Sequence, residues 1–110
     1  MVNEYGVKID RNGYAPSLLR RTENTCFLCG SNGFLQRHEI FHGTALREKS
    51  KKYGLWVTLC PDCHRLAHSD RAIAKGLKVT AEVEALEYYG WTVDEFRQRF
   101  GKSWIGESNG

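Results

Sequence analysis

The four cysteines are the residues whose chemistry is clearest in this sequence. They form two Cys-x-x-Cys pairs, Cys26/Cys29 and Cys60/Cys63, with no cysteine left over. Zinc prefers four tetrahedral sulfur or nitrogen ligands, and each pair can chelate from one side. The spacing therefore predicts a structural zinc held by all four cysteines, with disulfides as the alternative. Gly30, directly after the first pair, is typical of a zinc knuckle, whose tight turn points backbone amides at the thiolates.

Three of the four histidines form a second candidate metal site. His64 and His68 stand at i, i+4, so on a helix they share one face and can bind one ion. Cys63 and His64 are consecutive and project about 100° apart on a helix, so they serve different sites. His38, which lies between the two cysteine pairs, is the candidate third ligand. The alternative is that these are surface or capping histidines, because motif matches carry a risk of false positives.

A hairpin and a helix would bring these ligands together. Residues 34–41 predict a first strand, and residues 54–59 predict a second strand that ends at the second cysteine pair. Gly43 is expected to open a loop between them. Pro61 suits the first turn of a helix that carries both helical histidines and ends near Ser69.

The flanking segments are expected to support this unit. A turn signal at residues 10–13 favours a small hairpin near the N-terminus or an arm over the core. Residues 80–89 predict a helix ending at Gly90, and residues 92–95 form a capping box for a last helix. The α+β chain is thus divided into an N-terminal arm or hairpin (1–25), a zinc-stapled core (26–70), C-terminal helices that complete the core (71–105) and a flexible tail (106–110).

Charge and hydropathy limit the location and the partners. No apolar leader follows Met1, and no apolar run approaches the roughly 20 residues of a membrane span. We therefore expect a cytoplasmic protein without a membrane partner. The net charge of +3 is too small by itself to indicate nucleic acid, but residues 45–53 carry four basic residues against one acid. A solvated face is the alternative explanation of that cluster.

At this point the motifs resemble a known family. The first cysteine pair, a strand with a His-containing doublet, a second strand running into Cys-x-x-Cys-His and a further His one turn later resemble an HNH nuclease. This is the ββα-metal finger in the zinc-stapled form that small phage proteins often encode. The resemblance covers about residues 26–70, and the cysteine framework is its most specific part. Residues 100–105 also resemble the way such phage members end.

The resemblance implies a catalytic divalent cation (Mg, Mn, Ni or Zn) held by His38, His64 and His68, in addition to the structural zinc. The next position in the strand doublet is normally a histidine that acts as general base, and here it is Glu39. A carboxylate can take a proton from a metal-polarised water, although it is a weaker base than imidazole at neutral pH. His42 is a candidate substitute base or extra ligand, with a plain loop residue as the alternative.

The family's central Asn would fall near Leu55 and is absent. Apart from this missing Asn and the replaced base, the resemblance implies a DNA endonuclease of a bacterial or phage-infected cell. A homodimer would be suited to cutting both strands. The alternatives are a nucleic-acid-binding module that has lost its base, for example in phage recombination or packaging, and a protein-interaction module with a purely structural zinc. The expected nucleic-acid contacts are Arg37, Arg47, Lys49, Lys51, Lys52 and Arg65.

Overall fold

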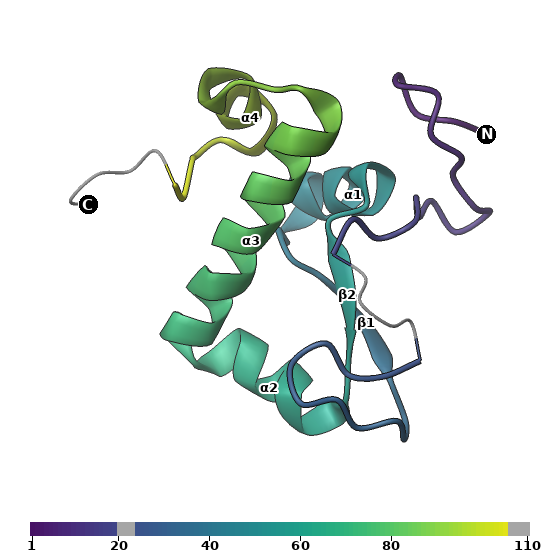
Figure 1. The fold of residues 1–110 in the computed structure, drawn as a ribbon, viewed down its shortest axis with the longest axis vertical. Helices are drawn as coiled ribbons and strands as arrows, with labels where there is room; N and C mark the ends of the chain where they lie inside the picture. Colours follow the sequence, from purple (N-terminus) through teal and green to yellow (C-terminus); the bar gives the residue numbers. More distant parts are fainter. Residues whose placement is uncertain (20–23, 106–110) are drawn as a thin grey trace.

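A two-stranded antiparallel sheet lies at the centre of the protein, among the helices (Figure 1). The computed structural model describes residues 1–19 and 24–105. Its elements in chain order are β1 (Gln36–Glu39), α1 (Thr44–Tyr53), β2 (Trp56–Leu59), α2 (Pro61–Ser69), α3 (Arg71–Tyr89) and α4 (Val93–Phe100). This arrangement confirms the predicted small α+β class with a hairpin followed by helices.

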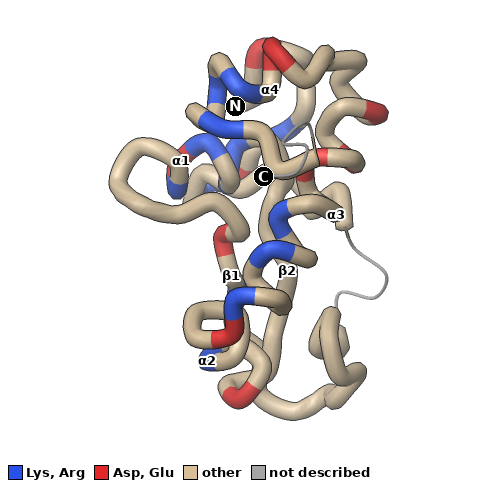
Figure 2. The backbone as a smooth tube through the Cα atoms, turned by 90° about the vertical axis from the view of Figure 1, so that its left-hand side faces the viewer, with Lys and Arg blue, Asp and Glu red and all other residues tan. Residues whose placement is uncertain are grey.

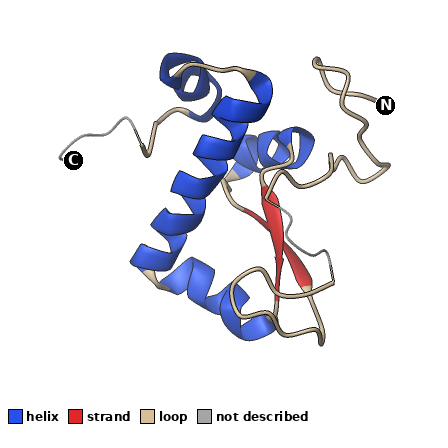
Figure 3. Ribbon diagram, in the orientation of Figure 1, coloured by secondary structure: helices blue, strands red, loops and turns tan. Residues whose placement is uncertain are grey.

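The pairing of β1 with β2 separates the side chains of the sheet into two sets. His38 pairs with Val57, and Glu39 pairs with Trp56. Successive side chains of a strand point to opposite faces, while directly paired residues share a face. His38 therefore faces α2 and α3, whereas Glu39 and Trp56 face the N-terminal arm (residues 1–19). Figure 3 shows α2 and α3 on one side of the strands and the tan arm on the other, with α1 at the upper end of the strands beside the arm.

The core lies between α3, the sheet and the last helix. Leu77, Ala81 and Ala85 on α3 are buried at four-residue spacing, which places them on one helical face. Phe96 and Phe100 of α4 stack with ring centroids 4.7 Å apart and both contact the ring of Phe41. This packing fixes α3 behind the hairpin, where it supports α2.

Several predicted helix boundaries are confirmed. Pro61 begins α2, and the backbone N–H of Cys63 points at the Cys60 sulfur, 3.4 Å away. Thr92 and Glu95 form the expected capping box of α4, because each side chain accepts from the other residue's backbone N–H. Gly90 ends α3 in the left-handed conformation, with φ 72°.

The prediction of a loop between the two strands is wrong, because residues 44–53 form the helix α1. This segment has no helix breaker, and lysines in its last turn suit the negative end of the helix dipole. Its buried face is narrow and includes the polar Ser50, so no clear apolar period marks the helix in the sequence. Gly54 ends α1 at φ 77°, and a Cβ there would lie 2.3 Å from the Pro16 carbonyl oxygen.

Other boundaries shift as well. Both strands are four residues long, shorter than the predicted ranges 34–41 and 54–59. The helix predicted over residues 80–89 begins earlier, at Arg71, where the Asp70 carboxylate accepts from the N–H groups of Ala72 and Ile73. The predicted tail lies outside the described residues.

The N-terminal arm is held to the body by buried polar contacts and forms no strand longer than the isolated bridge between Val2 and Lys8. The Asn3 amide donates to the Lys52 carbonyl at 2.9 Å, and its oxygen accepts from two backbone N–H groups of the arm. The turn predicted at residues 10–13 is present, since the Gly13 N–H bonds the Asp10 carbonyl. Within the described part of the chain, no helix has the length and apolar character that crossing a membrane requires.

Candidate metal centres

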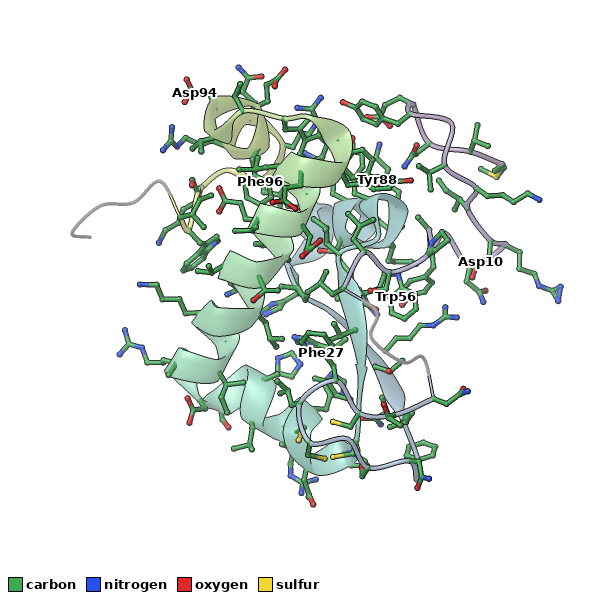
Figure 4. The ribbon with its side chains drawn as sticks, in the orientation of Figure 1. Asp10, Phe27, Trp56, Tyr88, Asp94 and Phe96 are labelled. Carbon is green, nitrogen blue, oxygen red and sulfur yellow. The ribbon has the colours of Figure 1, made fainter. Side chains whose placement is uncertain are left out.

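The four cysteines gather at the lower end of the sheet, where Figure 4 shows their yellow sulfur atoms beside the start of α2. All four sulfurs lie within 4.8 Å of one another. The sulfurs of Cys29 and Cys60 are 3.7 Å apart, and tetrahedral ligands at about 2.3 Å from zinc would be about 3.8 Å apart. The donor set and its spacing therefore fit zinc, as the sequence predicts, and none of the four forms a disulfide.

The backbone around the cysteines supports thiolate ligands. Burial opposes ionisation of Cys26, but N–H groups including that of Cys29 outweigh it and lower its pKa to about 6. Burial and the three neighbouring sulfurs raise the pKa of Cys63. Four thiolates packed this closely repel one another, so a bound cation is needed for all of them to ionise together.

The second cluster combines His38 of β1 with His64 and His68 of α2. One ring nitrogen from each lies within 4.8 Å of the others. Their ring centroids are 5.0 to 5.1 Å apart. His38 is 3% exposed, His64 is half-buried and His68 is exposed. The three imidazoles therefore converge from a strand and a helix on one point that is open on one side.

The electrostatics of this cluster favour the neutral imidazole of His38 and of His64. Burial, followed by the charges of His64, His68, His42 and Lys78, lowers the pKa of His38 to about 3. Burial also lowers the pKa of His64. A neutral imidazole offers the lone pair that a cation needs. The cluster therefore fits a divalent cation with three protein ligands and open positions.

Gln36 orients one of these ligands. Its amide oxygen lies 2.7 Å from Nδ1 of His64. Because this oxygen can only accept, Nδ1 carries the hydrogen and Nε2 keeps the lone pair for a metal. The sequence reasoning missed Gln36, although its position two residues before His38 places both side chains on the same face of β1.

Glu39 points away from the three histidines and is held by two donors. The hydroxyl of Tyr14 donates to one carboxylate oxygen, and Nε of Arg47 lies 3.1 Å from the other. Tyr14 comes from the N-terminal arm, 25 residues from Glu39 in sequence. No motif or periodicity marks this tyrosine, so the sequence reasoning missed it.

One cavity joins the histidines and Glu39. It has a volume of about 710 Å³ and passes from the His38 face of β1 to the Glu39 face. Arg37 and Arg47 also line it. Within residues 1–19 and 24–105, β1 pairs with β2 alone, so no strand of this part of the chain covers its other edge. A substrate lying along this edge would contact both the metal ligands and the carboxylate.

His42 lies near the cluster but outside its ligand set. Its ring centroid is 5.3 Å from that of His68 and 6.2 Å from that of His38. Its side chain is exposed, and it belongs to the short connection between β1 and α1. It lines the cavity of Glu39.

The predicted basic contacts differ in their surroundings. Lys49 donates to the Arg99 carbonyl at 2.7 Å, and Lys51 and Lys52 pair with Glu48 and Glu4, each at 3.6 Å. Lys49 and Lys52 therefore help to attach α1 to the rest of the protein, whereas the ion pair of Lys51 lies within α1. Arg37 and Arg47 line the cavity instead. Figure 2 shows Lys and Arg positions on α1 and α4 and, lower down, near α2, where Arg65 pairs with Asp62.

Two further positions clarify the site. Leu55, near the place of the family's Asn, is completely buried and belongs to the apolar core. Lys78 of α3, which the sequence reasoning missed, lies close enough to contribute to the lowered pKa values of both His38 and His42. Its ammonium also lies 4.7 Å from the centroid of the Trp104 ring.

Comparison with known proteins adds no family assignment: no protein-family model matches the chain, and no curated protein or solved structure matches it either.

Proposed function

We propose that this protein is a metal-dependent endonuclease that hydrolyses phosphodiester bonds in DNA, with a ββα-metal arrangement of the HNH type. The observation that carries the proposal is the cavity in which the three-histidine cluster and the Glu39 carboxylate lie on opposite sides of one strand edge. Three imidazoles with an open side suit a catalytic cation better than a structural one, whose ligand set is closed.

A divalent cation at this cluster would supply positive charge that polarises the scissile phosphate and stabilises the leaving 3′-oxygen. The side chains around it have separate roles in the proposal. Arg47 binds phosphate oxygens along the cavity, giving salt-dependent affinity. Glu39 accepts the proton of the attacking water as the bond to the 3′-oxygen breaks, and the leaving oxygen takes its proton from solvent. Tyr14 holds the carboxylate in position.

The second candidate is a nucleic-acid-binding module that retains the fold without cleavage. One observation favours it: both oxygens of Glu39 are engaged, one by Tyr14 and the other by Arg47. A carboxylate held in this way must give up one partner, or share an oxygen, before it can take a proton from water. In this alternative the histidine cluster stabilises the fold or contacts the phosphate through a bound cation.

A plasmid nicking assay separates the two. The zinc-loaded protein is assayed with Mg²⁺, Mn²⁺ and Ni²⁺ beside His64→Ala and Glu39→Ala, with Glu87→Ala on the exposed side of α3 as the matched control. Metal-dependent nicking that is lost in the first two variants and kept in the control supports the nuclease. Nicking lost only in His64→Ala moves the proton acceptor to another group such as His42. DNA binding without cleavage under every metal leaves the binding module.

A further inference from the structure

A second cavity lies on the arm side of the sheet, next to the histidine cavity. It has a volume of about 430 Å³, within the range of about 300–1,000 Å³ for small-molecule sites. Tyr14 and Arg37 line both cavities, so the two are neighbours along β1. Figure 4 shows Trp56 and Asp10, which line the second cavity, on the arm side of the strands.

Arg37 lies across two aromatic rings in this cavity. Its guanidinium carbon is 4.3 Å from the centroid of the Tyr14 ring and 4.9 Å from that of Trp56. The Trp56 ring is itself fixed, because its indole N–H donates to the Ala15 carbonyl at 2.7 Å. The guanidinium group is thus held against both rings, and the Arg37 side chain remains 41% exposed.

The charge of Arg37 is already offset, because one of its terminal nitrogens lies 3.8 Å from the Asp10 carboxylate. That carboxylate is also held by the N–H groups of Asn12 and Tyr14. Such a pair contributes little net charge for attracting a phosphate. What Arg37 brings to the cavity is a planar guanidinium group, and arginine planes stack on unpaired nucleobases.

We propose that this cavity binds the base of an unpaired nucleotide adjacent to the scissile phosphate, stacked on the outer face of Arg37. The inference rests on the proposed function for the position of the phosphate, which would lie in the neighbouring histidine cavity. Lys8 at the cavity wall suits the next phosphate of the same strand. A base inside a duplex cannot enter, because its faces are covered by its neighbours. The preferred substrate is therefore a single strand or a duplex with unpaired nucleotides.

Binding measurements test this without depending on cleavage. The zinc-loaded full chain carrying His68→Ala is titrated with a fluorescent single-stranded DNA oligonucleotide and with the matching duplex. Arg37→Lys in this background keeps the charge and removes the planar surface. It is expected to weaken single-strand binding about tenfold, the effect of losing one base-stacking contact, and to change duplex binding less than twofold. Arg97→Lys on the exposed side of α4 is the matched control.

A second readout uses thymidine 5′-monophosphate as the probe and follows the indole N–H resonances by NMR. The resonance of Trp56 should shift on titration, that of Trp104 should not, and Arg37→Lys should abolish the shift. The proposal would be overturned if Arg37→Lys lost equal affinity for single strand and duplex, or if it kept full affinity for the single strand. It would also be overturned if the protein bound neither DNA. Failure of the plasmid assay with the single-strand preference intact would remove the nuclease and leave the nucleotide site.

Discussion

The hydroxyl of Tyr14 donates a hydrogen bond to the carboxylate of Glu39, and so joins the N-terminal arm to the strand of the metal cluster. Burial and this hydrogen bond raise the pKa of Tyr14 to about 12, so the hydroxyl remains a donor at every pH where the fold is studied. The other carboxylate oxygen is held by Arg47 at 3.1 Å. Glu39 is therefore oriented from two sides, by residues that come before and after it in the chain.

Tyr14→Phe should slow cleavage while leaving the fold intact. The phenyl ring keeps its packing against Trp56, and only the donor to Glu39 is lost. A hydrogen bond to a charged group contributes about 1.5–3 kcal/mol, so we expect kcat to fall about tenfold or more with KM little changed. In a Glu39→Ala background the same change should cost nothing further, because the two residues act as one unit. Tyr88→Phe, at an exposed tyrosine, is the control. An unchanged kcat in Tyr14→Phe would remove Tyr14 from the site.

The sequence was informative where a feature depends on local spacing. The two cysteine pairs, the i, i+4 histidines and the Thr92 capping box are each defined within a few residues, and the structure brings them together as expected. The α1 helix was missed because its buried side includes Ser50, whose hydroxyl bonds the backbone of Phe41 instead of forming part of an apolar stripe. The Tyr14–Glu39 contact depends on how the arm packs, which no local pattern encodes.

Cys63→Ser should unfold the domain. Cys63 is buried, and zinc binding contributes directly to the folding free energy of small zinc-stapled domains. We expect loss of one equivalent of zinc and of the cooperative thermal transition, measured by metal analysis and circular dichroism. Cys26→Ser should behave in the same way, and Ser69→Ala at the exposed end of α2 is the control. Melting at the parental temperature in either cysteine variant would exclude the four-cysteine zinc site.

His68→Ala should abolish binding of a second cation without loss of the fold. His68 supplies one of three ligands and is exposed, so little packing is lost on truncation. Calorimetric titration of the zinc-loaded protein with Ni²⁺ should show one site in the parent and none in the variant. His42→Ala is the matched control, because His42 lies beside the cluster but outside its ligand set. Loss of the thermal transition in His68→Ala would make His68 a structural residue, and loss of Ni²⁺ binding in His42→Ala would add it to the ligands.

Gln36→Ala should weaken cation binding at the histidine cluster about 10–100-fold, which is the usual effect of losing a partner that orients a metal-bound histidine. The amide oxygen that fixes the Nδ1 hydrogen of His64 is lost, while the exposed position of Gln36 spares the core. The same Ni²⁺ titration measures the change, with Gln98→Ala on the exposed face of α4 as the control. Parental affinity in Gln36→Ala would show that packing alone orients His64.

Glu82→Ala should destabilise the domain more than any substitution of an exposed acid on α3. Glu82 is fully buried, and its carboxylate accepts from the Ser103 hydroxyl and the Trp104 N–H, both at 2.6 Å. Truncation removes the acceptor of these donors, which costs about 1–3 kcal/mol for each. We expect the melting temperature to fall by about 8 °C or more, since each kcal/mol shifts it by at least about 4 °C in a domain of this size. Glu82→Gln should recover part of the loss, because its amide oxygen can still accept from the Trp104 N–H. Glu87→Ala, at an exposed position one turn further along α3, should melt like the parent. An equal fall of the melting temperature in both alanine variants would mean that helix propensity, not the buried carboxylate, accounts for the effect.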